Sequence, residues 1–519
     1  MQAFEESPLF KPLPNNEIQC LCCQKYCVIP PGKLGHCRAR GNINGKPFSP
    51  VWGRYTVQID PIEKKPLYHF LPGTKVYSYG TVGCNFSCQF CQNSSLSMWK
   101  LDIEDVKCLK QNDVGYLDYY TPEEMVSQAI KNGCKSIAST YNEPTISTEF
   151  SYQVFKLAKE SGLHTVYVTN GFESVETLNY LGPYLDAVNI DLKSFREPFY
   201  QRICGAHLEG VCKTIQRCVA MGIHTEVTTL VIPGENDSDS ELSDCANFIA
   251  SIDKNIVWHL SAYHDDYNFH GRGVTPLNTL RRGAQIGRNA GIRFIYIGNV
   301  NAPEARLTKC PRCGKKLIDR EWFSATVSMS NGRCECGEVI PGLFEDANNL
   351  PPKLQFVPEN LLDIEDENEV NVNVSDNERG LVVYASKTGT SKDFAEKIAQ
   401  KLSFEVMDMS QFTVDILSKL RFVVFCVSTY GRGAPPQSAK QFWNQLMSFN
   451  GELPNLKFAV FGCGSTSFPK TFVKFAEDLR EKLLAMKCIE VIQIYKHDEM
   501  AEDEDENEVN GWIEKINFD

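Results

Sequence analysis

Cys84, Cys88 and Cys91 lie close together in the stretch Gly-Cys-Asn-Phe-Ser-Cys-Gln-Phe-Cys. An iron–sulfur cubane normally takes four cysteine ligands, so three thiolates on one short loop leave one iron without a protein ligand. Catalytic zinc sites keep an open position in the same way, so that a reactant can bind the metal. The spacing therefore predicts a catalytic 4Fe–4S cluster that binds another molecule at its fourth iron. A zinc knuckle or a chance spacing of cysteines is the alternative interpretation.

A second group of cysteines lies near the N-terminus and is also expected to bind a metal. Gly32 and Gly35 allow the tight turns that bring distant cysteines onto one site. The metal is either zinc or an auxiliary cluster, and free buried thiols are the alternative. Cys22 is a further thiol that could compete as a ligand. The four predicted ligands are Cys20, Cys23, Cys27 and Cys37.

A third group of cysteines is typical of a zinc ribbon. Cys310-Pro-Arg-Cys313-Gly and Cys334-Glu-Cys336-Gly are two loops with a glycine beside the second cysteine, which can present four thiolates tetrahedrally. The second loop is shorter than the usual Cys-x-x-Cys. We expect a closed, structural zinc site.

Strand-like and helical segments alternate between residues 70 and 300, which predicts parallel strands joined by crossover helices in a complete or partial (β/α) barrel. Thr121-Pro-Glu-Glu124 marks one helix start, with an N-cap, a proline at the first helical position and a capping-box glutamate. The expected strands are 75–79, 136–140, 164–169, 187–191, 225–232, 256–260 and 293–297.

Polar motifs follow most of these strands, at the end where active residues of such folds lie. Carboxylates are more often surface groups, a lone histidine is more often structural, and Asn170-Gly171 could be a simple turn. Their position at strand ends favours the functional interpretation. In chain order the motifs are the cysteine loop, Tyr141-Asn142-Glu143-Pro144, Asn170-Gly171, Asp191-Leu192-Lys193, residues 233–237 and Tyr263-His264.

Taken together, these motifs and Cys204-Gly-Ala resemble radical S-adenosylmethionine (SAM) enzymes, in particular those of the AmmeMemoRadiSam system, which are related to pyruvate formate-lyase activating enzymes. The resemblance extends from the cysteine-rich head through about residue 345. It implies that SAM chelates the open iron and that one electron from the cluster cleaves SAM. The resulting 5′-deoxyadenosyl radical then takes a hydrogen atom from the substrate.

The same resemblance implies which residues contact SAM. Asn142-Glu143 stands where the superfamily has a segment that meets the SAM amino group, whereas Thr169 and Asp191 are expected near the methionyl carboxylate and a cation. Val168 departs from the aspartate that activating enzymes tend to have at that position. The predicted SAM-binding residues are Phe90, Asn142, Glu143, Thr169, Asn170, Asp191, Lys193 and His264.

The C-terminal part resembles a flavodoxin domain of the kind found in diflavin reductases. An apolar strand at 381–385 leads into a Ser/Thr-rich loop before a helix, which is a phosphate-binding arrangement. Two further strands, 422–426 and 457–461, lead into loops in which Tyr430 and Phe468 would stack on the flavin ring. The predicted residues for flavin mononucleotide (FMN) are Ser386, Thr388, Gly389, Thr390, Ser391, Ser428, Thr429, Tyr430, Gly431, Gly464 and Phe468.

Composition indicates a multidomain globular protein. The chain has 519 residues, of which 42% are hydrophobic, and no run of 18 apolar residues offers a membrane span. The N-terminus lacks a targeting pattern, so we expect a cytoplasmic protein, in which 21 cysteines favour metal ligation over disulfides. The net charge of −12 disfavours nucleic acid as a partner.

We expect an α/β protein with five parts: a cysteine-rich metal-binding head (1–69), a radical SAM barrel (70–300), a zinc-ribbon-like module (301–345), an acidic linker (346–378) and a flavodoxin-like doubly wound sheet (379–519). Ten acidic residues against one basic residue in 345–378 favour a disordered linker.

The expected function is reductive cleavage of SAM, with single electrons supplied by the fused FMN domain and hydrogen abstraction from an unidentified small-molecule or protein substrate. An external reductase or ferredoxin is expected to recharge the flavin, since no second nucleotide-binding domain follows. The alternatives are a glycyl-radical-enzyme activase, a tRNA-modifying radical SAM enzyme and a non-catalytic electron-transfer or metal-binding protein. Wybutosine-pathway enzymes place the flavodoxin before the barrel, in the opposite order.

Overall fold

The computed structural model divides the chain into two compact units, residues 1–362 and 363–519, which are described separately. It describes residues 2–3, 7–99, 117–321, 323–362, 380–386, 390–429, 435–449, 451–466, 471–498 and 506–516. Among these residues, no helix has the length and apolar character needed to cross a membrane.

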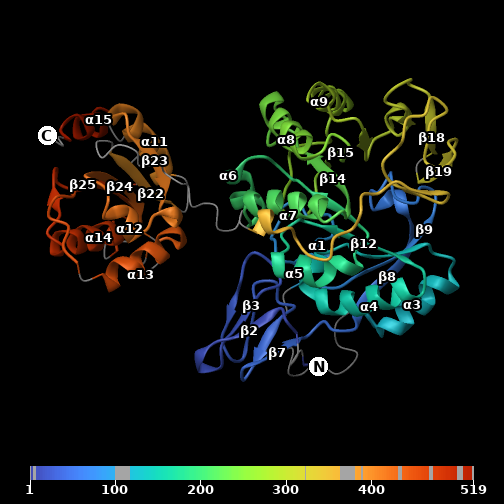
Figure 1. Ribbon diagram of the computed structural model, residues 1–519, viewed down its shortest axis with the longest axis horizontal. Helices are drawn as coiled ribbons and strands as arrows, with labels where there is room; N and C mark the ends of the chain where they lie inside the picture. Colours follow the sequence, from blue (N-terminus) through green and yellow to red (C-terminus); the bar gives the residue numbers. More distant parts are fainter. Residues whose placement is uncertain are drawn as a thin grey trace. The chain divides into compact units, whose positions relative to one another are not determined.

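A nine-stranded sheet forms the centre of the first unit, and seven of its strands are parallel and follow one another in chain order (Figure 1). This arrangement is the partial barrel that the alternating segments predict, with every parallel strand within two residues of its expected bounds at each end. The parallel strands are β9 (Lys75–Gly80), β11 (Ser136–Ser139), β12 (His164–Thr169), β13 (Ala187–Asp191), β14 (His224–Val231), β15 (Val257–Ala262) and β16 (Ile295–Gly298).

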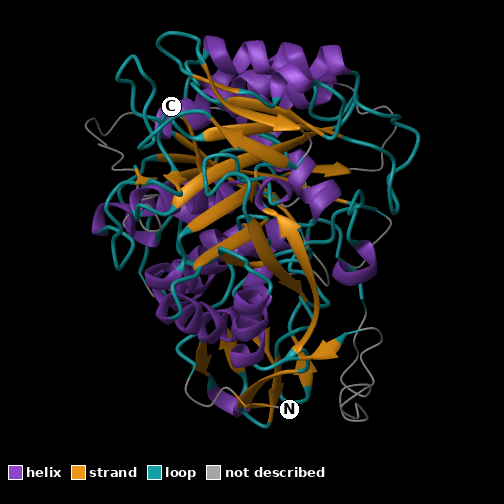
Figure 2. Cartoon of the chain, turned by 90° about the vertical axis from the view of Figure 1, so that its right-hand side faces the viewer, coloured by secondary structure: helices purple, strands orange, loops and turns teal. Residues whose placement is uncertain are grey.

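Helices connect the parallel strands and cover the sheet, as the strands in orange and helices in purple show in Figure 2. The capping box at Thr121 is present: its side chain accepts a hydrogen bond from Glu124 N, and the Glu124 carboxylate accepts one from Thr121 N. The main helices are α3 (Pro122–Lys131), α4 (Thr148–Glu160), α5 (Val175–Leu181), α7 (Leu208–Ala220), α8 (Asp239–Ile252) and α9 (Leu277–Asn289).

Two strands that the sequence did not predict extend this sheet. β8 (Arg54–Pro61) pairs antiparallel with β9, and β10 (Asp118–Tyr119) pairs antiparallel with β8. β8 is two-faced, with Tyr55 buried and Ile59 exposed. Only its pairing with a neighbouring strand distinguishes such a segment from a loop. β8 connects the head to the barrel.

The head consists of short antiparallel strands, and the ribbon is a small separate sheet. Head strands are β1 (Gln2–Ala3), β2 (Phe10–Pro12), β3 (Ile18–Cys20), β4 (Val28–Ile29), β5 (Lys33–Leu34), β6 (Gly41–Ile43) and β7 (Lys46–Ser49). The ribbon contains β17 (Thr308–Lys309), β18 (Lys316–Glu321) and β19 (Ser324–Val327), followed by the hairpin of β20 (Leu343–Phe344) and β21 (Ala347–Asn348).

The start of the expected linker differs from the structure. Residues 346–362 belong to the first unit, where Leu354 N donates to Met221 O at 2.8 Å and Val357 N donates to Asn179 Oδ1 at 2.7 Å. This segment ends in α10 (Glu359–Leu362). The acidic residues are concentrated after residue 362, so composition alone placed the boundary too early. Residues 363–379 lie outside the described part of the chain.

The second unit is a doubly wound parallel sheet with strand order β23-β22-β24-β25-β26. Its central strands are apolar on both faces because helices cover both: Val383 and Phe425 lie in one core, whereas Val382 and Val424 lie in the other. The strands are β22 (Leu381–Ala385), β23 (Glu405–Asp408), β24 (Phe422–Ser428), β25 (Lys457–Gly464), β26 (Ile489–Glu490) and β27 (Tyr495–Asp498). The helices are α11 (Thr390–Leu402), α12 (Val414–Leu417), α13 (Lys440–Ser448), α14 (Lys474–Ala485) and α15 (Glu506–Glu514).

Candidate active site

The three-cysteine loop lies between β9 and α1 (Ser94–Ser97), at the carboxyl edge of the parallel strands. Cys88 is buried, whereas Cys84 and Cys91 are partly exposed. The loop backbone is held from across the sheet, because Ser87 N donates to Cys204 O at 2.8 Å and Gln89 N donates to Ile203 O at 3.0 Å. A loop anchored in this way can keep three sulfurs in place for a cluster before the cluster is bound.

Two asparagines at neighbouring strand ends hold this loop. Asn142 Nδ2 donates to Gly83 O at 2.8 Å, and Asn142 Oδ1 accepts from Thr81 N at 3.1 Å. Asn170 Nδ2 donates to Asn85 Oδ1 at 2.7 Å and lies 3.9 Å from Cys84 Sγ. The two predicted SAM-site asparagines therefore brace the cysteine loop from β11 and β12.

Glu143, a predicted SAM contact, is 1% exposed. Its carboxylate is buried and accepts hydrogen bonds from Thr145 N, Asn170 N and Thr169 Oγ1 at 2.8–3.1 Å. Thr169 Oγ1 also donates to Glu173 Oε1, so two buried glutamates share one hydroxyl. Burial, and then the neighbouring Glu173, raise the pKa of Glu143. The raised pKa means that Glu143 and Glu173 hold a proton between them. The Glu143 carboxylate also positions Asn170, because it accepts a hydrogen bond from the Asn170 backbone N–H.

Asp191, the last residue of β13, and Lys193, just after the strand, form an ion pair with Lys193 Nζ 2.7 Å from Asp191 Oδ2. Burial would lower the pKa of Lys193, but the negative charges of Asp191, Cys88 and Cys204 outweigh burial and raise it. Lys193 is thus a fixed positive charge near a cluster ligand. A hydrogen bond with Cys204 lowers the pKa of Cys88, which favours the thiolate that binds iron.

The other two predicted SAM contacts differ in environment. Phe90 is 4% exposed and packs against Phe199 and Phe269, so its ring is part of the core beneath the loop. His264 follows β15 and is exposed, with its Nε2 3.1 Å from Gln92 Nε2, one residue beyond Cys91. The fold thus brings His264 to the cysteine loop, although it lies 172 positions after Gln92 in the sequence.

The site has an unmatched polar atom that suits a bound group. Among the described residues, Asn170 Oδ1 is buried without a hydrogen-bond partner, next to Cys84. Buried polar atoms normally have a partner, and an amine or another donor on a ligand would supply one. The donor set of three cysteines with a flanking cation fits a 4Fe–4S cluster and the charged ends of SAM.

The predicted FMN loops meet at the carboxyl edge of the second sheet. Ser428 Oγ donates to Ala385 O at 3.2 Å, which joins the ends of β22 and β24, and Thr429 N donates to Cys463 O at 3.1 Å. This is the topological switch point of a 2-1-3-4-5 sheet. Thr388, Gly389, Tyr430, Gly431 and Phe468 lie outside the described residues.

The start of α11 also suits the phosphate group of FMN. Thr390 and Ser391 begin α11, and Ser391 Oγ is fully buried without a partner among the described residues. A helix N-terminus with a free hydroxyl suits a phosphate. Ser386 lies just before it, at the end of β22. Gly464 lies so close to the next element that an added Cβ would be 2.9 Å from Val473 N.

The ribbon cysteines are arranged for a single ion. Sγ atoms of Cys310 and Cys336 lie 3.6 Å apart, and those of Cys313 and Cys334 lie 3.5 Å apart. All four sulfurs lie within 4.8 Å of one another. A tetrahedral zinc with bonds of about 2.3 Å places its sulfurs about 3.8 Å apart, so the geometry fits zinc despite the shortened second loop.

The head cysteines Cys20, Cys23, Cys27 and Cys37 line one cavity together with Cys22. Burial, and then the neighbouring Cys20, raise the pKa of Cys37 to about 12.

Sequence reasoning missed three residues of the site. Glu173 has no motif of its own, Asn85 and Cys204 lie within motifs, and neither of these two was assigned a role. Cys204 ends a π-helical turn (Tyr200–Cys204), and Gly205 follows with φ of 66°. A glycine directly after a cysteine was the available signal for this sharp turn.

The fold and the cysteine site define a radical SAM enzyme joined to a flavodoxin domain. The family model of the radical SAM superfamily matches residues 78–246, and the flavodoxin model matches residues 382–512. The chain belongs to the radical SAM superfamily, and its cofactors are SAM, a 4Fe–4S cluster and FMN. The narrower AmmeMemoRadiSam assignment stays a prediction.

Relatives cover the two units separately. An uncharacterized protein, MJ0808, of Methanocaldococcus jannaschii is 37% identical over 341 residues, which is 64% of this chain and 98% of that protein. NADPH–cytochrome P450 reductase of Rattus norvegicus is 32% identical over 123 residues, 21% of this chain and 18% of that protein. A solved short-chain flavodoxin associated with a bacterial microcompartment is 24% identical and covers 27% of this chain and 96% of its own, with a TM-score of 0.24.

Proposed function

We propose that this protein reductively cleaves SAM at a 4Fe–4S cluster held by Cys84, Cys88 and Cys91, with electrons from FMN in its own flavodoxin domain. When bound, the cluster and SAM supply a 5′-deoxyadenosyl radical that takes hydrogen from a substrate. The observation that supports this most directly is the convergence of strand ends on the cysteine loop: Asn170 from β12 and Lys193 after β13 both lie beside its ligands.

The chain's own residues would bind and orient the reactants. Lys193 places a positive charge beside Cys88, which stabilises the negative charge of a reduced cluster. Asn170 Oδ1 is available to accept a hydrogen bond from the SAM amino group. Asp191, whose side chain is 37% exposed, is available to solvent or to a ligand at the mouth of the site.

Fusion would supply the electron donor in the same chain. A tethered domain acts at an effective concentration that is about millimolar for a short flexible linker, so each cleavage event need not wait for a diffusing donor. The relatives of the second unit named as NADPH-dependent reductases support an external nicotinamide-driven reductase, or a ferredoxin, as the partner that recharges the flavin.

The test is anaerobic reconstitution followed by SAM turnover with the FMN reduced, scoring 5′-deoxyadenosine. We expect release by the wild type and none by Cys88→Ala. Cys212→Ala is the matched control, because it also removes a thiol but lies on α7, a helix that packs against β14 and is not part of the cysteine loop. Equal release by wild type and Cys88→Ala, or none from a fully loaded wild type, would contradict the proposal.

A further inference from the structure

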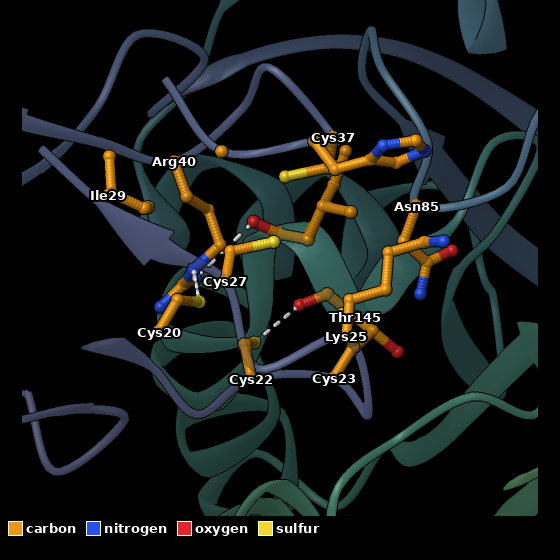
Figure 3. Close-up of a pocket in the computed structure, with 13 residues that line it drawn as sticks. Cys20, Cys22, Cys23, Lys25, Cys27, Ile29, Cys37, Arg40, Asn85 and Thr145 are labelled. Atoms are coloured by element: carbon orange, nitrogen blue, oxygen red, sulfur yellow. Dashed lines mark hydrogen bonds between the residues drawn. The ribbon is translucent and has the colours of Figure 1, made fainter. Parts of the chain in front are cut away.

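The head contains a small cavity, of about 20 Å³, whose walls are rich in sulfur. Five cysteines line it, with Lys25, Arg40 and Asn85 among the polar residues, and Figure 3 shows how they surround one space. The family model begins at residue 78, so this site lies outside the part of the chain that the superfamily defines.

Cys22 is set apart from the other four. Its Sγ donates to Thr145 O at 2.8 Å, a bond drawn as the dashed line between Cys22 and Thr145 in Figure 3, and contacts Thr148 Oγ1 at 3.3 Å. A thiol that uses its proton in a hydrogen bond to a carbonyl is not poised as a thiolate ligand. Cys20, Cys23, Cys27 and Cys37 remain, which matches the four ligands of a cubane.

Sulfur spacing distinguishes a cluster from a single ion. In the described part of the chain, the ribbon cysteines are the group whose ligand atoms all lie within 4.8 Å of one another. Neither the head cysteines nor the three barrel cysteines form such a group. A cubane holds its cysteine sulfurs farther apart than a single tetrahedral ion does, because each binds a different iron. The head cysteines are therefore not gathered as tightly as the ribbon cysteines, and in this they agree with the three cysteines of the barrel loop.

Polar groups in the cavity wall favour an anionic, sulfur-containing occupant. Asn85 is 1% exposed, and its Nδ2 has no hydrogen-bond partner among the described residues. Its hydrogen bond with Asn170 uses the other amide atom, Oδ1, and leaves Nδ2 available as a donor. Arg40 Nε donates to Cys20 Sγ at 3.2 Å, while its other nitrogens bind Glu149 at 2.6 Å. Hydrogen bonds to cluster sulfurs are a known means of stabilising iron–sulfur sites.

We propose that Cys20, Cys23, Cys27 and Cys37 hold a second 4Fe–4S cluster, and that Asn85 and Arg40 donate hydrogen bonds to its sulfurs. With four cysteine ligands this cluster has no open iron and does not bind SAM. It lies next to the catalytic loop: a Cβ on Gly83 would be 2.5 Å from Cys37 O, and Asn85 directly follows Cys84. This inference is independent of the proposed reaction.

The test is metal content and electron paramagnetic resonance of the full chain after anaerobic reconstitution. We expect about eight iron atoms and about one zinc per wild-type chain. The triple variant Cys84→Ala, Cys88→Ala, Cys91→Ala should retain about four iron atoms, with a reduced-cluster signal that SAM does not change. The double variant Cys23→Ala, Cys27→Ala should also retain about four, with a signal that SAM shifts.

Cys22→Ala is the matched control and should keep about eight iron atoms. The inference is overturned if the wild type binds about four iron and about two zinc atoms, or if the triple variant binds zinc but no iron. Both measurements use chains with an intact head, so they decide the question even if the head variant does not fold.

Discussion

Asn170 and Asn85 are joined by a hydrogen bond of 2.7 Å between Asn170 Nδ2 and Asn85 Oδ1. This bond connects the end of β12 to the cysteine loop, and it orients the free Nδ2 of Asn85 and the free Oδ1 of Asn170 at the two neighbouring sites. Breaking it should disturb both without removing any metal ligand.

We expect Asn170→Ala to weaken SAM binding by about 10-fold or more, in the range seen when groups that orient metal ligands are lost. The measurement is 5′-deoxyadenosine formation as a function of SAM concentration. Asn289→Ala, on an exposed position at the end of α9, is the matched control. An unchanged SAM dependence would show that Asn170 does not position the site.

Glu143 should make stability depend on pH. Its pKa is raised from 4.5 to about 8 by burial and by Glu173. A carboxylic acid that binds its proton more tightly in the folded state stabilises the folded protein. This stabilisation is complete at pH values below the pKa of the unfolded state, and it is lost as the pH rises through the pKa of the folded state. The free energy of unfolding should therefore fall between pH 4.5 and about 8.

Glu143→Gln should flatten this fall, because the amide cannot lose a proton. The measurement is urea unfolding across the pH range, followed by near-ultraviolet circular dichroism. Glu123→Gln, at an exposed position in the first turn of α3, should keep the wild-type slope. The prediction is wrong if the Glu143 variant and the wild type show parallel pH profiles.

Lys193→Met should make the catalytic cluster harder to reduce, because a positive charge beside Cys88 favours the more negative reduced state. We expect the midpoint potential to become more negative, by on the order of tens of millivolts. Redox titration followed by electron paramagnetic resonance measures it. Lys131→Met, in the last turn of α3, should leave the potential unchanged; a shift toward positive values in Lys193→Met would refute the electrostatic argument.

Cys313→Ser should remove about one zinc per chain without lowering the iron content, because the ribbon site is closed and separate. Loss of a structural zinc removes folding free energy, so the thermal transition of the ribbon should move to lower temperature. Elemental analysis and calorimetry check both points. Cys488→Ser, in the second unit, should keep the zinc. Loss of iron together with zinc would contradict the assignment.

Gly464→Ala should weaken FMN binding by about 10-fold, which corresponds to about 1.4 kcal/mol. An added Cβ would be 2.9 Å from Val473 N, so the loop after β25 must shift. Gly511→Ala is a sharp control: Gly511 lies in α15 with no neighbouring atom within 4 Å of an added Cβ, and alanine there should stabilise the helix. Equal flavin affinity in both variants would exclude a close approach at Gly464.

Alternation of strands and helices was predictable from the sequence because it depends on local patterns. Val166 and Val188 lie in short apolar runs between helical segments, and these runs fold as parallel strands. Motif spacing likewise predicted the cysteine loop at the end of β9 and the three loops at the edge of the second sheet. Local spacing is sufficient here because ligands on one loop are positioned by that loop.

Side-chain direction required the tertiary structure. Glu143 follows β11 as predicted, but only the folded structure shows that its carboxylate accepts hydrogen bonds from Thr169 Oγ1 and Asn170 N, at the end of β12. Cys204 and Glu173 have roles only because distant segments meet.

The sequence by itself determined that this chain has three groups of clustered cysteines and two α/β units, because spacing and periodicity are properties of the chain. Only the tertiary structure distinguished the ribbon cysteines, which lie close enough for one ion, from the head cysteines, which do not form such a close group among the described residues. That difference depends on distances between sulfurs, which are set by how β3 and the loops around Cys27 and Cys37 pack together. The spacing of cysteines along the sequence does not determine these distances.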